Sequence, residues 1–275
     1  MRLSEAADRL RAADIPNALY EARLLFSHFG GLAPSQLYGG DPVCDTERIE
    51  PYLCRRERRE PMAYILGEQG FYRETYLVSE DTLIPREDTE ILVDFAVKHL
   101  PVGARFADLC TGSGCIALSV LNNTEGTTAV AVDLSEGALK VARKNAERLG
   151  LSERVRFAQA DVLSDALSSV LSSDAPFDAI LCNPPYIPRE VYETLAPEIF
   201  FEPESAFVGE EEGMIFYRVL ISALRPMLKA GGFLSFEIGY DQAERMRALA
   251  QESGYDAEIL KDLSGNSRVA LLFPK

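Results

Sequence analysis

Apolar and polar positions follow two different patterns along the chain, and the change falls near residue 66. Before that point, apolar side chains recur at the spacing of one helix face, most clearly over residues 17–30 and 45–60. Asn17 is a possible cap for the first of these helices. Its apolar face consists of Leu19, Ala22, Leu25, Phe26 and Phe29. The sequence therefore predicts a small helical bundle over residues 1–66.

The pattern changes over residues 67–85, which are rich in aromatic residues, threonine and valine. This composition predicts a β-hairpin or a short extended linker between two domains. Residues 86–100 return to helical spacing, with Asp88 or Thr89 as the expected cap. The expected buried face of this helix consists of Ile91, Leu92, Phe95 and Ala96.

From residue 105 onwards, short apolar strands alternate with helices. Such alternation predicts a mostly parallel sheet with helices on both faces. The last two expected strands, "AEILKD" and "RVALLFP", are separated only by "LSGNS", which predicts a hairpin and hence an antiparallel edge strand. The fold class is therefore α/β, with residues 86–275 as one domain after the small helical domain.

The charge of the chain argues against some partners. With 28 Lys+Arg against 43 Asp+Glu, the formal net charge is −15, so the molecule repels a phosphate backbone at long range and direct nucleic-acid binding is not expected. No apolar run approaches membrane-spanning length, and the first residues, "MRLSEAADRLRAAD", do not resemble a secretory signal. We therefore expect a cytoplasmic protein without a membrane partner.

One short run is strongly basic. "CRRERRE" brings together Arg55, Arg56, Arg58 and Arg59. A solvated helix face balanced by Glu57 and Glu60 is the favoured interpretation, and docking onto an acidic or RNA-associated partner is the alternative.

Metal chemistry is not expected. The five cysteines contain no C-x-x-C pair, and the chain has two histidines. Cys110, Cys115 and Cys182 lie near expected strand ends and could converge, but small buried thiols are the favoured explanation.

The loop after the first strand of the alternating region predicts a nucleotide-like ligand, because ligands of open α/β sheets bind beyond the carboxyl ends of the strands. In "DLCTGSGC", Gly112 and Gly114 let backbone approach a ligand closely. Asp133 ends the second strand, where a carboxylate can accept both hydroxyls of a ribose. Asp161 and Val162 end the third strand, where they can bind the amino group and cover the ring of an adenine.

These residues fit two cofactors. Gly112, Gly114 and Ala117 match the G-x-G-x-x-[GA] fingerprint of dinucleotide-binding proteins, with Asp133 at the expected distance. The same loop can pack against S-adenosylmethionine (AdoMet), with Asp108 near the ammonium group. A lone G-x-G does not decide between them.

The loop after the fourth strand, "NPPY", carries the sharper signal. Pro184 restricts Asn183 to extended conformations, and neither Pro184 nor Pro185 has an N–H group. The Asn183 side-chain oxygen and the Pro184 carbonyl can therefore accept both hydrogens of one NH2 group, while Tyr186 offers a ring face to a planar group. Such a loop suits methyl transfer from a sulfonium to an amide or aromatic amine nitrogen, driven by orientation and electrostatics.

"NPPY" together with "DLCTGSGC" resembles the AdoMet-dependent amino-methyltransferases. Further stretches narrow the resemblance to the HemK-type release factor glutamine methyltransferases, from about residue 21 to the C-terminus. The stretches that carry it include "EARLLFSH", "RRERREPMAYILGEQGFY", "LIPREDTEILV", "AVDLSEGALKVARKNA", "FEPESAF", "GMIFYRVL", "EIGYDQ" and "KDLSGNSRV".

The resemblance implies a seven-stranded, Rossmann-like methyltransferase sheet and methylation of the amide nitrogen (N5) of the glutamine in the Gly-Gly-Gln loop of class I peptide-chain release factors. It implies that the N-terminal helices contact the release factor, with a role for Arg55 to Arg59. Nothing in the sequence demands more than a monomer. The implied AdoMet site consists of Cys110, Thr111, Gly112, Ser113, Gly114, Asp133, Asp161, Val162 and Asn183. Asn183, Pro184, Pro185 and Tyr186 would hold the glutamine, with Asn183, Pro184 and Tyr186 as the catalytic group.

The chain departs from the family pattern at three positions. Cys110 and Glu210 stand where glycine is usual, and Glu87 stands where proline is usual. These departures bear on affinity and partner fit more than on the reaction. The alternatives to the expected function are a nucleic-acid amino-methyltransferase, an NAD-dependent oxidoreductase and a non-catalytic AdoMet-binding scaffold.

Overall fold

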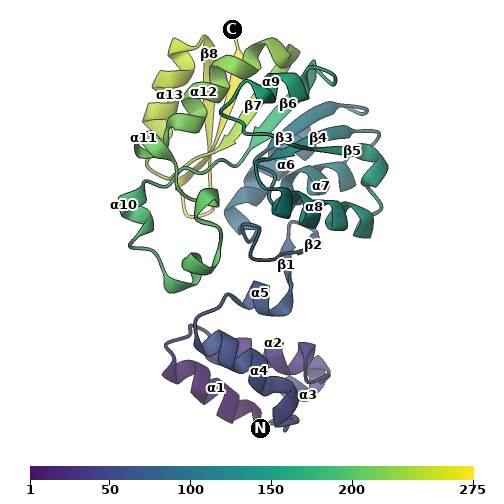
Figure 1. The fold of residues 1–275 in the computed structure, drawn as a ribbon, viewed down its shortest axis with the longest axis vertical. Helices are drawn as coiled ribbons and strands as arrows, with labels where there is room; N and C mark the ends of the chain where they lie inside the picture. The colour runs from purple at the N-terminus through teal and green to yellow at the C-terminus, as the bar shows by residue number, and fades with distance from the viewer. The chain divides into compact units, whose positions relative to one another are not determined.

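The computed structural model describes residues 1–275, and they divide into two compact units (Figure 1). The helical unit comprises Met1–Glu68 and Ala196–Phe201, and the sheet unit comprises Gln69–Leu195 and Glu202–Lys275. This division differs from the expected one in two respects. Residues 69–85, expected as a linker, belong to the sheet unit. The short segment Ala196–Phe201, expected within the methyltransferase domain, belongs to the helical unit.

The helical unit is built on a core of small and branched apolar side chains. Its helices are α1 (Leu3–Ala12), α2 (Ala18–His28), α3 (Pro34–Tyr38), α4 (Thr46–Glu57) and α5 (Met62–Leu66), with the 3-10 turn η3 (Pro197–Phe201). The largest buried members of the core are Leu10, Leu25, Phe26, Ile49 and Leu53. The Asp45 side chain caps α4 by accepting a hydrogen bond from the Glu47 N–H. The expected Asn17 cap is wrong, because Asn17 adopts a left-handed conformation and its side chain makes no capping bond.

The basic run lies in the helical unit, and most of its charge is neutralised there. Arg56 is only 4% exposed and forms ion pairs with Glu21 and Glu198. Glu198 also pairs with Arg59, and Arg55 pairs with Glu60. A solvated helix face is therefore the wrong description of Arg56, which fastens η3 to the helices instead.

The sheet unit contains a seven-stranded mixed sheet in the order β5-β4-β3-β6-β7-β9-β8. The strands are β3 (Arg105–Leu109), β4 (Thr128–Asp133), β5 (Val155–Gln159), β6 (Phe177–Cys182), β7 (Leu228–Glu237), β8 (Tyr255–Lys261) and β9 (Ser267–Pro274). The five strands β3 to β7 pair in parallel, while β9 pairs antiparallel with both β7 and the edge strand β8. The predicted mixed sheet with an antiparallel edge strand is confirmed. A separate two-stranded sheet consists of β1 (Glu68–Phe71) and β2 (Glu74–Leu77).

Helices cover both faces of the sheet, as the alternating pattern predicted (Figure 1). One face packs against α6 (Glu90–His99), α7 (Cys115–Asn122) and α8 (Glu136–Arg148); the other packs against α9 (Ala166–Leu171), α12 (Ile215–Leu224) and α13 (Ala243–Glu252). The remaining short elements are α10 (Arg189–Tyr192), α11 (Glu210–Gly213), η1 (Glu87–Thr89), η2 (Ser152–Arg154), η4 (Glu204–Ala206) and η5 (Arg225–Met227). None of the helices has both the length and the apolar character of a membrane-spanning segment.

The register of the sheet brings four loops to one edge. Leu109 at the end of β3 lies level with Val132 of β4 and with Cys182 of β6. Asp133 at the end of β4 lies level with Gln159 of β5. The segments that follow these strands therefore meet at the carboxyl edge of the sheet, where parallel α/β sheets bind ligands.

Candidate active site

A cavity of about 450 Å³ opens at the carboxyl edge of the sheet, a volume typical of small-molecule sites. Seven of the expected site residues line it: Cys110, Gly112, Asp133, Asp161, Val162, Asn183 and Pro185. Thr111, Ser113, Gly114, Pro184 and Tyr186 are not among its lining residues. All of these residues belong to the sheet unit. The cavity therefore joins the expected cofactor loop and the Asn-Pro-Pro-Tyr loop in one space.

Asp108 holds the glycine loop in shape. Its Oδ2 accepts hydrogen bonds from the Thr111 hydroxyl at 2.6 Å and from the Ala117 N–H at 3.1 Å. The carboxyl group is fully buried, and this burial raises its pKa to about 7. Its Oδ1 has no hydrogen-bond partner. Asp108 does not line the cavity, so its observed contacts support the loop rather than a ligand.

The two glycines of the loop do different things. A Cβ atom at Gly112 would meet no atom within 4 Å, which fits its place on the cavity wall. At Gly114 it would lie only 3.1 Å from Leu118 and 3.2 Å from Ala142, so α7 and α8 can approach only a glycine. Asn145 of α8 also donates to the Ser113 carbonyl at 2.9 Å, a support that the sequence analysis missed.

Cys110 carries a side chain where the backbone favours glycine. Its φ is 58°, in the left-handed region, so the departure from the family's glycine has a conformational cost. The Cys110 thiol interacts with the Cys182 thiol, and burial followed by this hydrogen bond raises the pKa of Cys182. Cys115 lies in the core cluster on the other face of the sheet. The three cysteines therefore do not converge.

The Asp133 carboxylate is fixed by two hydrogen bonds and can accept further ones. Its Oδ2 accepts from the Gly112 N–H at 2.8 Å, and its Oδ1 accepts from the Ser135 N–H at 2.9 Å. Burial raises its pKa, while these backbone donors act in the opposite direction. Because each carboxylate oxygen can accept two hydrogen bonds, both oxygens can still bind a pair of hydroxyls in the cavity.

The lining of the cavity beyond Asp133, toward the end of β5, is mostly apolar. Val162 is 5% exposed and lines the cavity, while the exposed Asp161 accepts a hydrogen bond from the Leu163 N–H. The apolar lining here is completed by Leu134, Ala138, Ala160, Leu163, Ile215 and Phe216. Such walls match the faces of an aromatic ring, and a carboxylate at the rim matches its amino group.

The Asn-Pro-Pro-Tyr loop is fixed by segments that are distant in the sequence. The Asn183 Nδ2 group donates to the Thr89 hydroxyl at 3.3 Å, and the Tyr186 hydroxyl donates to Glu237 Oε1 at 3.0 Å. A Cβ atom at Gly213 would lie 2.0 Å from the Tyr186 carbonyl oxygen, so backbone packs directly on backbone there. Thr89 and Glu237 were not singled out as site residues from the sequence.

Two further polar residues lie at the site. Glu210, one of the departures from the family pattern, lines the cavity and is exposed, so it adds a negative charge to the opening. Glu202 is buried and accepts hydrogen bonds from the Ile84 N–H and from Arg86. This contact joins the "LIPREDTEILV" and "FEPESAF" stretches beside the cavity, which the sequence did not predict.

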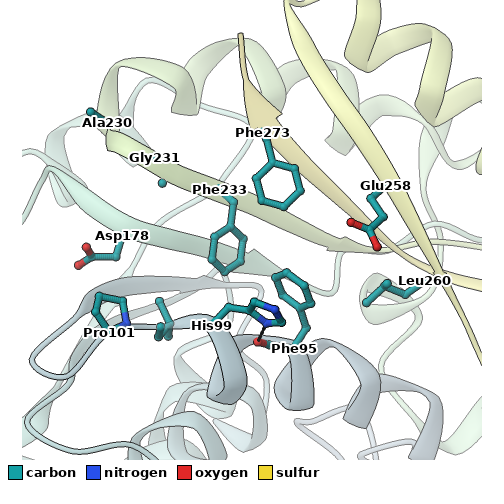
Figure 2. Close-up of a pocket in the computed structure, with 12 residues that line it drawn as sticks. Phe95, His99, Pro101, Asp178, Ala230, Gly231, Phe233, Glu258, Leu260 and Phe273 are labelled. Atoms are coloured by element: carbon teal, nitrogen blue, oxygen red, sulfur yellow. Dashed lines mark hydrogen bonds between the residues drawn. The ribbon is translucent and has the colours of Figure 1, made fainter.

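A second concavity, of about 720 Å³, contains no residue of these loops in its lining. Figure 2 shows the residues that line it. It is lined by aromatic rings, including Phe95, Phe233 and Phe273, and His99 stacks on Phe95 at 3.9 Å between ring centres. Asp178 at its edge already accepts from the Arg105 N–H and from Lys229. Because the second concavity borders the amino ends of β6 and β7, whereas ligands of α/β sheets bind at the carboxyl ends, the smaller cavity is the better candidate site.

Comparison with known proteins gives the class that this fold and cavity define. The family model described as Methyltransferase small domain matches residues 87–215, and the one described as PrmC N-terminal domain matches residues 2–67. A solved structure of a ribosomal protein L11 methylase from Lactobacillus delbrueckii subsp. bulgaricus shares the fold, with a TM-score of 0.51 and 19% identity over 72% of this chain and 84% of that one. The protein is an AdoMet-dependent methyltransferase, which decides between the two cofactors that the glycine loop left open.

Similarity over nearly the whole chain then identifies the family. A release factor glutamine methyltransferase from Rhodospirillum rubrum is 39% identical, over 98% of this chain and 83% of that protein. Those from Caulobacter vibrioides and Salmonella typhimurium are 37% and 38% identical, over 97% of this chain and 93% and 95% of their own lengths. The chain belongs to the release factor glutamine methyltransferase family.

Proposed function

We propose that this protein methylates the side-chain amide nitrogen (N5) of the glutamine in the Gly-Gly-Gln loop of class I peptide-chain release factors, in the cytoplasm and in support of translation termination. The observation that carries the proposal is the Asn-Pro-Pro-Tyr loop, stiffened by two prolines and opening into the same cavity as the glycine loop. The names of the most similar relatives support the release factor as substrate.

The residues present fit AdoMet. The Asp133 carboxylate has the acceptor capacity for the ribose hydroxyls, and Asp161 and Val162 suit the amino group and the ring of adenine. Cys110 and Gly112 face the cavity, whereas Thr111, Ser113 and Gly114 shape the loop from behind. We assign the loop as a whole to the cofactor, with Asn183 at the boundary between cofactor and substrate.

The glutamine amide would bind across the Asn-Pro-Pro-Tyr loop. The Asn183 Oδ1 atom and the Pro184 carbonyl accept its two N–H bonds, because proline supplies no competing donor. Pro185 closes the wall of the cavity, and Tyr186, which is not among the lining residues, is assigned to the plane of the amide. Two fixed acceptors turn the nitrogen lone pair toward the methyl donor, an effect of orientation.

The chemistry needs no strong base. Bound AdoMet supplies a methyl group on a positively charged sulfur. On transfer, the amide nitrogen would take the methyl carbon, the electron pair of the broken carbon–sulfur bond would stay on sulfur, and the nitrogen would then lose its proton to water. Asn183 and the Pro184 carbonyl stabilise the positive charge that develops on the nitrogen before the proton leaves.

The helical unit remains the proposed contact for the release factor body, but its basic run is a poor candidate for the contact itself. Arg55, Arg56 and Arg59 are already engaged in ion pairs within that unit. Arg58 is the exposed arginine of the run. A monomer remains part of this proposal.

Methyl-labelled AdoMet tests the proposal. The protein would be incubated with a purified class I release factor, with the same factor carrying alanine at the Gly-Gly-Gln glutamine, and with total RNA and DNA. We expect label on the unmodified factor alone. Label on nucleic acid but on neither factor would contradict the proposal in favour of a nucleic-acid amino-methyltransferase.

A further inference from the structure

The proposed function requires one particular orientation of the Asn183 side-chain amide, and the loop that contains Asn183 does not fix this orientation. A side-chain amide presents an acceptor on one side and two donors on the other. If Asn183 were turned over, its NH2 group would face the NH2 group of the substrate, and neither could accept. The prolines fix the backbone of the loop but not the rotation of the terminal amide.

A buried chain of hydrogen bonds meets this requirement. The Asn183 Nδ2 group donates to the Thr89 hydroxyl at 3.3 Å, and that hydroxyl donates to Glu237 Oε2 at 2.5 Å. The second distance matches a charge-assisted hydrogen bond to a carboxylate, about 2.5–2.7 Å. Thr89 and Glu237 are each 3% exposed, so water does not compete for these groups.

The single proton of the Thr89 hydroxyl decides the direction of this chain of hydrogen bonds. A threonine hydroxyl has one proton, and here that proton points to Glu237. The Thr89 oxygen can therefore only accept from Asn183, which selects the NH2 side of the amide and leaves Oδ1 directed away from Thr89. We propose that Thr89 and Glu237 are positioning residues that fix the Asn183 amide with its oxygen toward the substrate nitrogen; this inference rests on the proposed function.

Glu237 also fixes the other end of the loop. Its Oε1 accepts the Tyr186 hydroxyl at 3.0 Å, so one carboxylate holds both the acceptor and the aromatic ring that would contact the glutamine. The Gln242 side chain adds a bond to the Tyr186 carbonyl at 3.2 Å. A rotation of either side chain would disturb the same carboxylate, which couples the two.

One feature indicates that this chain of bonds does not serve the fold alone. Thr89 has helical φ and ψ values of −67° and −20°, so its hydroxyl has no capping role at the start of α6, and it is directed to Glu237. Burial raises the pKa of Glu237, so its ionised form is costly in the native state. A buried group that lowers stability in this way is expected at a functional site.

The test replaces the Thr89 hydroxyl with a methyl group of similar size. Thr89→Val should lower kcat for methyl transfer by about 10-fold or more, through misplacement of the acceptor, with the AdoMet dissociation constant unchanged in calorimetry. Thr89→Ser should restore kcat. In an Asn183→Ala background, Thr89→Val should cost no further activity, because the group that it positions is gone.

Ser119→Ala is the matched control. The Ser119 hydroxyl is fully buried and donates to the Glu74 carboxylate at 3.0 Å, outside the candidate site. This variant loses the same kind of bond and should show a similar fall in melting temperature with kcat intact. If Thr89→Val kept the kcat of Ser119→Ala, or lowered activity equally in the Asn183→Ala background, the positioning role would be wrong.

A measurement without substrate separates this inference from the proposed function. In the ¹⁵N-labelled protein, the side-chain NH2 signals of Asn183 are assigned by their disappearance in Asn183→Ala. Thr89→Val should shift them, whereas Thr89→Ser and Ser119→Ala should not. Unmoved signals would overturn the positioning role even if the release factor is methylated, and a shift would support it even if the methyl group goes to another amine.

Discussion

The loop after β3 and the loop after β6 border the same cavity, yet they are held in different ways. The glycine loop is supported from nearby, by Asp108 three residues before Thr111 and by Asp133 at a separation of 21 residues from Gly112. The Asn-Pro-Pro-Tyr loop is supported from far away. Asn183 contacts Thr89 across 94 residues, and Tyr186 contacts Glu237 across 51.

This difference matches the tasks that we propose for the two loops. A cofactor is bound by several backbone and side-chain groups, so no single contact has to be placed very accurately. Transfer to a poor nucleophile depends on the direction of one lone pair, and a small misplacement has a large effect on rate. Changes at the β6 loop should therefore act on kcat, and changes at the β3 loop on affinity or stability.

The largest effect is expected at Asn183. Asn183→Ala removes the fixed acceptor and should lower kcat by about 100-fold or more, comparable to the loss of one preorganised group in other enzymes. Its AdoMet dissociation constant should change much less. Steady-state methyl transfer and calorimetry measure the two quantities, and retained kcat would mean that the acceptor role is misassigned.

Asp133 should show the opposite behaviour. Asp133→Ala loses a charged acceptor of the ribose hydroxyls and a bond to the Gly112 N–H, so AdoMet binding should weaken by about 10- to 30-fold. With saturating AdoMet, kcat should largely recover. Asp133→Asn, which keeps one acceptor oxygen, should lie between the two proteins in calorimetry; an unchanged affinity in both variants would remove Asp133 from the cofactor site.

Asp108 should affect stability through pH. Burial raises the pKa of its carboxyl group from the ordinary value near 3.8, which applies in the unfolded chain, to about 7 in the folded protein. Between these values the native state binds more protons than the unfolded state, so this group's contribution makes stability fall as pH rises. Asp108→Asn should flatten the profile between pH 4 and pH 7 by at least about 1 kcal/mol in urea unfolding. A profile parallel to that of the wild type would contradict the assigned burial.

Cys110 should have the smallest effect. Cys110→Gly removes a side chain from a residue with a left-handed backbone conformation, which stabilises the native state, but it also raises the conformational entropy of the unfolded chain. The free energy of unfolding should therefore rise by at most about 1 kcal/mol. AdoMet affinity should remain within about 2-fold, since a tenfold change would need about 1.4 kcal/mol. Loss of affinity in this variant would show that the thiol itself contacts the cofactor.

Much of this architecture could be predicted because its signals are local. The alternation of strands and helices, the final hairpin and the two loops at strand ends each depend on residues close together in the sequence. Two consecutive prolines such as Pro184 and Pro185 end a strand whatever the tertiary context. Asp133 is recognisable as the last residue of an apolar strand.

The supports of the β6 loop could not be predicted in the same way. Thr89 reads as an ordinary helix cap, and only the folded chain shows its hydroxyl directed to Glu237. The sequence places Arg56 in a solvated basic face, because it does not show that Glu198, in a distant segment, forms an ion pair with Arg56. One signal was available: Glu237 is a carboxylate at the end of the apolar strand "GGFLSFE", which is unusual for a residue buried in a sheet.

The most direct test of the account is a structure of the protein with S-adenosylhomocysteine and a peptide that carries Gly-Gly-Gln. We expect the glutamine amide nitrogen at hydrogen-bond distance, about 3 Å, from both Asn183 Oδ1 and the Pro184 carbonyl oxygen. We also expect the Thr89 hydroxyl still between Asn183 and Glu237. An amide bound elsewhere in the cavity, or an Asn183 side chain that turns its NH2 group toward the peptide, would contradict the account.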